Sequence, residues 1–322
     1  MTQLSATEGY YIGIDLGGTR IRAARYTPEL EMQQRTETHT RSEEGQEAVI
    51  KRIVEQARIV WPTDGKPVLG VGVSAPGPTN PVSGIVVAAP NLMGWHNVAL
   101  RDTLQSELGV ATYLGNDANL AALAETVIGA ARGYTDVLFL TISTGIGGGV
   151  ITNGKLLIGS EGLGAECGHV IIVVENDKVS TLEKESAGPA IARQARAAIA
   201  AGEKSSVLDL AAGKVEAITT PMVTKAAESG DPLAIRLIER AGMIVGLGIV
   251  SFLHIFNPQI VILGGSVAEH TGDLFMQPLK EAIRTYAIDE SYWARLIIAP
   301  AELGENVSLI GAAALALRKG GQ

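Results

Sequence analysis

Two glycine-rich turns, each directly behind a short apolar run, are the segments of this chain best suited to bind phosphate. The first is Asp15-Leu-Gly17-Gly18-Thr19 and the second is Ser143-Thr144-Gly145-Ile-Gly147-Gly-Gly149. Glycine has no Cβ, so the backbone N–H groups of such turns can approach phosphate oxygens closely. The pair predicts two contacts to one polyphosphate, although either turn alone is also typical of a plain β-hairpin.

Two aspartates stand at the ends of predicted strands. Asp117 follows Asn116 at the start of a predicted helix, where its carboxylate can accept the proton of an alcohol that attacks phosphorus. Capping the helix is the alternative role for Asp117. Asp15 directly precedes the first turn and is a candidate to orient a magnesium ion, although aspartate also favours turns for local reasons.

A third group of polar residues follows the second turn. Glu166 and His169 lie in the segment Gly162-Leu-Gly-Ala-Glu-Cys-Gly-His169, and Glu183 comes further along the chain. Carboxylates accept hydrogen bonds and imidazole donates or accepts them, which suits the hydroxyl groups of a sugar. A structural role for His169 and a core role for Cys167 are the alternatives.

Two familiar nucleotide motifs are absent. The run Gly149 to Lys155 has Walker A spacing, but Leu156 stands where a magnesium-binding Ser or Thr is needed, and the run is more typical of a hairpin. Val150 and Cys167 occupy the last glycine position of the two possible G-x-G-x-x-G matches. A dinucleotide-binding fold is therefore not expected.

The composition is that of an acidic globular protein. Of 322 residues 46% are hydrophobic and 19% are charged, and the net charge is -8. The length favours two domains, and the charge argues against nucleic acid and anionic membranes as partners. The single cysteine fits a reducing compartment, and no basic-then-apolar leader opens the chain. The longest apolar stretch, Ala241 to Phe256, is too short to span a bilayer and predicts a buried helix.

Strands and helices alternate along the chain, which predicts α/β layers with ligands at the carboxyl ends of the strands. The strands are expected at residues 10–14, 21–26, 68–73, 111–114, 137–142, 149–152 and 260–263. The helices are expected at residues 43–60, 100–108, 118–131, 189–200, 220–229, 232–256 and 312–318.

Five motifs, in this order, resemble the ROK family of sugar kinases, repressors and open reading frames, and in particular its bacterial-type glucokinases. They are Asp15-Leu-Gly-Gly-Thr19, Gly115-Asn-Asp117-Ala-Asn119, Ser143-Thr-Gly-Ile-Gly-Gly-Gly149, the segment from Gly162 to His169, and Leu263-Gly-Gly-Ser266. The resemblance covers nearly the whole chain from about Tyr10. It implies an α/β protein with the two-lobed actin-like ATPase (ribonuclease H-like) fold and a cleft for sugar and ATP between the lobes.

The resemblance also implies roles for individual residues. Asp117 would be the general base. The residues that would bind or shape the site for the sugar are Ser74, Gly77, Asn91, Asn116, Glu166, His169 and Glu183. Those that would bind the nucleotide are Asp15, Gly17, Gly18, Thr19, Thr144, Gly145, Gly147, Gly264, Gly265 and Ser266. The small sugar-binding lobe would be residues 1–119 plus 303–322, and the large nucleotide-binding lobe residues 120–302.

The chain departs from the family pattern after His169. Most members place a three-cysteine zinc knuckle there, but residues 171–182 contain no cysteine. Cys167 and His169 alone do not make a tetrahedral site. We therefore expect no structural zinc, and the placement of Glu183 is open.

The expected activity is ATP- and Mg²⁺-dependent phosphorylation of a hexose 6-hydroxyl, with glucose first and fructose or an N-acylhexosamine (N-acetylmannosamine or N-acetylglucosamine) as alternatives. A sugar-sensing regulator would need a DNA-binding motif before the first turn, and only 14 residues precede Asp15. An actin-like filament ATPase would not need Glu166, His169 and Glu183. The resemblance implies a cytoplasmic homodimer whose ligands are sugar and ATP, with no nucleic acid and no membrane.

Overall fold

The computed structural model describes residues 8–175 and 178–320. The chain forms two compact units. The first unit combines the residues up to Val137 with Gly149–Ala165 and the residues from Ala301 onward. The second unit combines Leu138–Gly148 with Glu166–Pro300.

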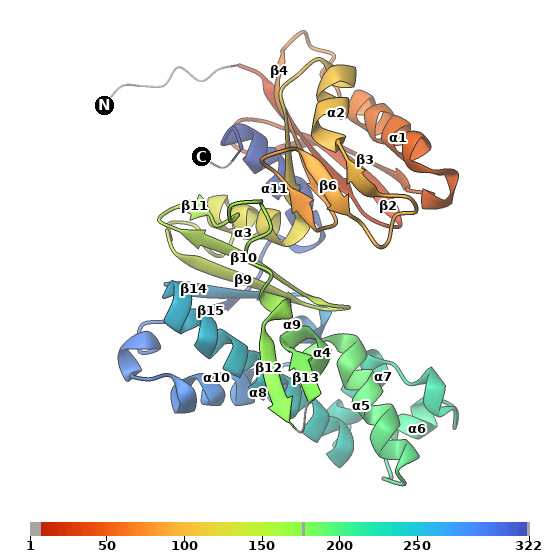
Figure 1. Ribbon diagram of the computed structural model, residues 1–322, viewed down its shortest axis with the longest axis vertical. Helices are drawn as coiled ribbons and strands as arrows, with labels where there is room; N and C mark the ends of the chain where they lie inside the picture. The colour runs from red at the N-terminus through yellow and green to blue at the C-terminus, as the bar shows by residue number, and fades with distance from the viewer. Residues whose placement is uncertain (1–7, 176–177, 321–322) are drawn as a thin grey trace. The chain divides into compact units, whose positions relative to one another are not determined.

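A five-stranded sheet forms the centre of the first unit (Figure 1). In order across the sheet, its strands are β3 (Met32–His39), β2 (Arg20–Tyr26), β1 (Tyr10–Leu16), β4 (Val68–Ala75) and β8 (Thr112–Asn116). β1 and β2 are antiparallel, as predicted for a hairpin around the first glycine turn. β1, β4 and β8 are parallel, so their carboxyl ends lie at one edge. A separate three-stranded sheet contains β5 (Thr79–Asn80), β6 (Ile85–Ala88) and β7 (His96–Val98).

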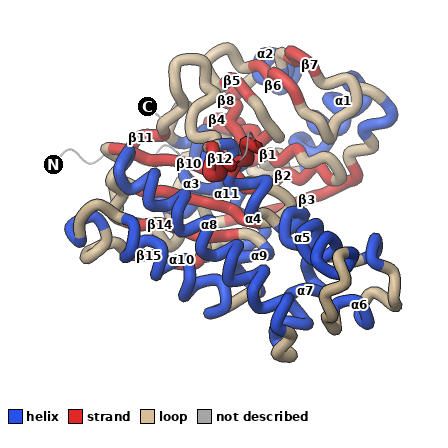
Figure 2. The backbone as a smooth tube through the Cα atoms, turned by 60° about the horizontal axis from the view of Figure 1, so that its bottom comes forward, coloured by secondary structure: helices blue, strands red, loops and turns tan. Residues whose placement is uncertain are grey.

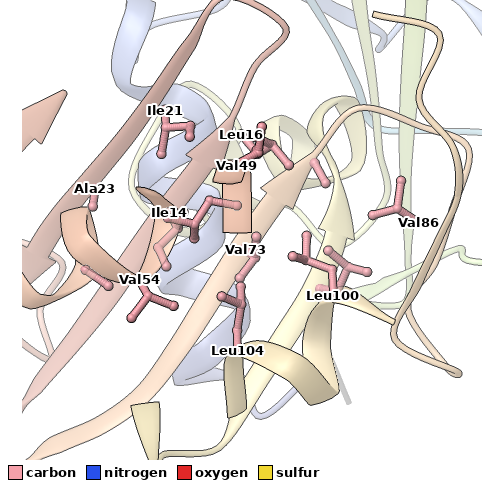
Figure 3. Close-up of a cluster of buried hydrophobic side chains, with 14 of the residues drawn as sticks. Ile14, Leu16, Ile21, Ala23, Val49, Val54, Val73, Val86, Leu100 and Leu104 are labelled. Carbon is pink, nitrogen blue, oxygen red and sulfur yellow. The ribbon is translucent and has the colours of Figure 1, made fainter. Parts of the chain in front are cut away.

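Apolar side chains on one face of the first sheet pack against α1 (Gln46–Ile59) and α2 (Leu100–Leu108) (Figure 3). Ile14 and Val73 from the sheet join Val49 of α1 and Leu104 of α2 in one buried cluster. The helical spacing predicted for residues 43–60 is confirmed, because most of the apolar positions that repeat along α1 are buried.

The other core cluster of the first unit contains α3 (Asp117–Val127) and α11 (Val307–Leu317). α11 begins at Val307 rather than at residue 312 as predicted. It lies against two strand glycines: a Cβ on Gly13 would be 2.2 Å from the Leu309 carbonyl oxygen, and one on Gly72 would be 1.7 Å from that of Ala312. These glycines therefore set how closely α11 approaches β1 and β4.

A second five-stranded sheet has the order β11 (Lys155–Leu156), β10 (Ile146–Thr152), β9 (Val137–Ile142), β14 (Ile260–Gly264) and β15 (Ile297–Pro300). β10 and β11 form an antiparallel hairpin with Thr152 opposite Lys155. The run with Walker A spacing is thus a hairpin, as predicted.

Helices make up most of the second unit (Figure 2). They are α4 (Leu182–Ser186), α5 (Gly188–Ala200), α6 (Val207–Leu210), α7 (Thr220–Glu228), α8 (Pro232–Phe256), α9 (Ser266–His270) and α10 (Asp273–Tyr286). The apolar stretch from Ala241 to Phe256 is part of α8, and Gly242 and Gly246 let it pack closely on α10. A Cβ on Gly242 would lie 2.1 Å from the Phe275 carbonyl oxygen of α10, and one on Gly246 would lie 2.5 Å from that of Leu279. Within the described ranges, no helix combines the length and apolar character needed for a membrane span.

A short hairpin follows His169, where most family members would place the zinc knuckle. Its strands are β12 (Ile171–Glu175) and β13 (Lys178–Thr181), which pair antiparallel. The sequence analysis predicted no element here.

Candidate functional site

Three predicted site residues meet at the carboxyl edge of the first sheet. The strand register sets Asp15 of β1 beside Ser74 of β4, and the next residue, Ala75, beside Asn116 of β8. The parallel order of β1, β4 and β8 produces this alignment, since each strand ends at the same edge.

Asp117 is the first residue of α3 and is exposed. The side chain of Asn116 caps this helix by accepting a hydrogen bond of 3.0 Å from the N–H of Ala118. Oδ1 of Asp117 accepts from the same N–H at 2.8 Å. Because Asn116 already serves as the cap, Asp117 is not needed for that role alone, and its exposed carboxylate can be reached by a substrate.

Two further residues predicted for the sugar, Ser74 and Gly77, lie at the end of β4 and in the loop after it. The side chain of Ser74 is fully buried, and among the described residues its hydroxyl oxygen has no hydrogen-bond partner. Gly77 lies in that loop, and a Cβ there would be 2.6 Å from the amide nitrogen of Asn116. Gly77 therefore leaves room for the Asn116 side chain that caps α3.

The first glycine turn lines a cavity of about 340 Å³ with Asp15, Arg20 and Arg22. The N–H of Gly17 donates to the carbonyl of Arg20 at 2.9 Å, which closes the turn. A Cβ on Gly18 would lie 2.9 Å from the Cβ of Asn91. Asn91, another residue predicted for the sugar, thus lies against the turn predicted to bind phosphate.

Asp15 forms an ion pair that the sequence analysis did not predict. Nε and Nη2 of Arg22 donate to Oδ2 of Asp15 at 3.0 Å and 2.8 Å, and Nη1 donates to the Glu305 carbonyl at 2.7 Å. Both donors use one carboxylate oxygen, Oδ2. Mg²⁺ is typically held by one or two carboxylates together with substrate phosphates, which a single aspartate at this turn fits.

In the second unit, Ile146 joins the residues predicted for the sugar to the second glycine turn. Its N–H donates to Oε2 of Glu183 at 2.8 Å, and a Cβ on Gly168 would lie 2.0 Å from its carbonyl oxygen. Glu166 and His169 are exposed residues on either side of Gly168. The structure therefore brings Glu166, His169 and Glu183 to one strand end.

Cys167 is buried between Glu166 and Gly168. Burial, with a smaller contribution from the Glu166 carboxylate, raises the pKa of the Cys167 thiol to about 12. In the absence of a metal, this thiol therefore stays protonated at neutral pH. Among residues 8–175 and 178–320, no three His, Cys, Asp or Glu side chains are grouped to hold a metal ion.

A larger cavity in the second unit, of about 730 Å³, begins at the second glycine turn. Ser143, Thr144 and Ser266 line it, and the hydroxyl oxygens of Ser143 and Ser266 lie 3.1 Å apart. The Gly188 N–H, at the start of α5, donates to the Ser143 carbonyl at 2.8 Å. A helix N-terminus beside a glycine turn favours an anion, and the volume suits a nucleoside.

Four glycines near this cavity are expected to contact the nucleotide, Gly264 and Gly265 beside the adenosine and Gly145 and Gly147 at the phosphates. Gly265 has a φ of 89°, and a Cβ there would lie 2.5 Å from the Ile142 carbonyl oxygen, so no other residue fits. Gly264 ends β14, while Gly147 is the second residue of β10. A Cβ on Gly145 would lie 2.5 Å from Oε2 of Glu183.

The far wall of this cavity contains residues that the sequence analysis missed. They come from α5, α7 and α9 and include Pro189, Arg196, Thr220, Lys225, Glu228 and His270. The guanidinium of Arg196 donates to the Ile218 carbonyl at 2.8 Å and 3.1 Å, and His270 Nδ1 lies 2.7 Å from the Ser266 carbonyl oxygen. These residues carry no local motif, so helix packing alone brings them to the glycine turns.

The chain is similar to known proteins along almost its entire length. The ROK family model matches residues 11–319. A glucokinase of Thermotoga maritima is 35% identical over 309 residues, which are 94% of this chain and 96% of that protein. The structure of a ROK family glucokinase from Streptomyces griseus in complex with glucose and AMPPNP has a TM-score of 0.76 and 30% identity, covering 95% of this chain and 99% of that one. The ROK hexokinase of Thermus thermophilus has a TM-score of 0.81 and 33% identity, covering 95% and 97%.

These structural matches confirm the predicted fold class, the two-lobed actin-like ATPase fold, in which strands and helices alternate in α/β layers. The family match extends across the glycine turns, Asp117 and the segment from Glu166 to Glu183. From its sequence and its structure, this chain belongs to the ROK family.

Proposed function

We propose that this protein is an ATP-dependent hexose kinase that phosphorylates the 6-hydroxyl of glucose. The observation that carries the proposal is the exposed carboxylate of Asp117 at the start of α3, next to the strand edge that holds Asp15. As the sugar oxygen attacks the γ-phosphoryl group, this carboxylate would accept the hydroxyl proton.

The nucleotide would be held by the two glycine turns and the cavity of about 730 Å³. Backbone N–H groups of the turns would bind the phosphates, and the nucleoside would occupy the cavity beside Thr144 and Ser266. Magnesium bound with ATP would neutralise phosphate charge, and Asp15 would help to hold it. Arg22 would keep the Asp15 carboxylate in one orientation.

The sugar would be recognised by Asn91, Asn116, Glu166, His169 and Glu183, with Ser74 and Gly77 supporting the loop. We infer glucose because the similar proteins include glucokinases, one of them bound to glucose and AMPPNP. Fructose and N-acylhexosamines stay alternatives, since carboxylates, amides and imidazole suit the hydroxyls of all these sugars.

A coupled assay of ADP release tests the proposal. Purified protein would be given MgATP and, one at a time, glucose, fructose, N-acetylmannosamine and N-acetylglucosamine. We expect the highest kcat/KM with glucose. Replacing ATP with polyphosphate and measuring the sugar phosphate formed, instead of ADP, identifies the phosphoryl donor. Turnover of a different sugar would replace glucose but keep the kinase class, whereas ATP hydrolysis with no sugar dependence would overturn the proposal.

Three expectations from the resemblance stay proposals. They are a small sugar-binding lobe of residues 1–119 plus 303–322 with a nucleotide lobe of residues 120–302, a homodimer, and a cytoplasmic location. The lone cysteine supports the last of these.

A further inference from the structure

Glu125 is a carboxylate that the proposed reaction does not use, yet it is fully buried. It lies near the end of α3, the helix that begins with Asp117. Within the part of the chain that the structure describes, no Lys, Arg or His forms an ion pair with Glu125. A buried carboxylate is costly unless hydrogen bonds compensate for the lost water.

Backbone N–H groups from two separate segments provide this compensation. Oε2 of Glu125 accepts from Ala130 at 2.8 Å, in the turn after α3. Oε1 accepts from Glu302 at 2.9 Å and from Leu303 at 3.1 Å. A Cβ on Gly129 would lie 2.1 Å from Oε2, so the adjoining turn leaves room for the carboxylate only because glycine stands there. One side chain thus fastens the end of α3 to residues 302–303.

Residues 302–303 occupy a special place in the chain. The chain passes from the second unit into the first between Pro300 and Ala301, so Glu125 binds the first residues after this passage. From there the chain continues directly into α11, which touches α3 at its middle. A Cβ on Gly311 of α11 would lie 2.1 Å from the Leu120 carbonyl oxygen.

We propose that Glu125 is a positioning residue for the phosphoryl transfer. By fastening the last turn of α3 to the segment where the chain re-enters the first unit, it keeps the whole helix, and therefore Asp117 at its other end, in the reacting position. This inference rests on the proposed role of Asp117. A helix behaves as a rod, so releasing one end displaces the other, and a shift of about 1 Å in a reacting group can cost about 100-fold in rate.

The test compares Glu125→Gln with Asp231→Asn. Glutamine has the size of glutamate but turns an N–H₂ toward backbone donors, so it breaks at least one of the three hydrogen bonds. We expect kcat to fall about 10-fold to 100-fold while the KM for sugar stays within about twofold. Asp231 is the control: it is also buried, caps α8, and accepts from Ser206 at 2.7 Å and Ala234 at 3.0 Å. Its variant should lower the melting temperature without lowering kcat.

Hydrogen exchange gives a readout that does not depend on turnover. In Glu125→Gln the amides of Glu302 and Leu303 and the first turn of α3 should exchange faster than in the wild type. A folded variant with wild-type kcat, or an equal loss of kcat in Asp231→Asn, would overturn the inference. If Glu125→Gln does not fold, Glu125→Asp, whose carboxylate is one methylene short, is judged by the same criteria. The assay of sugar phosphorylation by the wild-type protein tests the proposed function without any variant of Glu125. Failure of the proposed function can therefore be told apart from failure of this inference.

Discussion

At the scale of single residues, the two possible roles of Asp117 predict different effects of its substitution. The side chain of Asn116 caps α3, so substitution of Asp117 should cost little stability. We expect Asp117→Asn to keep sugar and ATP binding and a near wild-type melting temperature, while kcat falls at least about 100-fold because the general base is lost. Steady-state kinetics with calorimetry of sugar binding measures both.

Asp102 offers a matched control for that variant. It is an exposed aspartate in the first turn of α2, in the same unit but with no proposed part in the reaction. Asp102→Asn should leave kcat unchanged. A folded Asp117→Asn protein that turns over as fast as the wild type would exclude Asp117 as the base.

At the scale of elements, the β12–β13 hairpin stands where a zinc knuckle is expected in most of the family. Its strands pair through backbone hydrogen bonds, with Val174 opposite Val179, and need no metal to hold them together. We expect metal analysis of protein purified without chelator to give far less than one zinc per chain, and chelator to leave the melting temperature unchanged. Stoichiometric zinc would contradict this expectation.

At the scale of the whole molecule, the first unit is built from three separate stretches of the chain, and the last of them contributes α11. Leu309, Ile310 and Leu315 of α11 are buried in one core cluster, and each stabilises the unit by about 1.5–3 kcal/mol. Their sum is comparable to the net stability of a domain, about 5–15 kcal/mol. A chain that ends at Pro300 should therefore leave the first unit unfolded.

Limited proteolysis and calorimetry would measure this effect of truncation. The first unit should become protease-sensitive in the chain that ends at Pro300, whereas a control chain that ends at Lys319 should resist protease like the full protein. If the first unit without α11 still unfolds cooperatively and resists protease, α11 is not required for its core to fold.

Local pattern predicted much of the secondary structure. The predicted helices 100–108 and 232–256 coincide with α2 and α8, and the predicted strand 137–142 coincides with β9. Several elements were missed, and for some of them the reason can be identified. β3 is an edge strand of mostly exposed polar residues, α10 carries Pro278 in its interior, and the β12–β13 hairpin exposes apolar side chains such as Val174. Each breaks the pattern that sequence analysis uses, because tertiary packing overrides local preference.

The sequence by itself determined the family, the α/β class and the identity of the glycine turns, since these depend on residue types at short spacing. Only the tertiary structure decided how distant residues meet. It joined Glu183 to the second turn through Ile146, lined the cavity proposed for the nucleotide with α5, α7 and α9, and bound Glu125 to residues 302–303. The physical reason is that these hydrogen bonds and cavity walls form between segments far apart in the chain. Such contacts produce no periodicity or spacing in the local sequence from which they could be predicted.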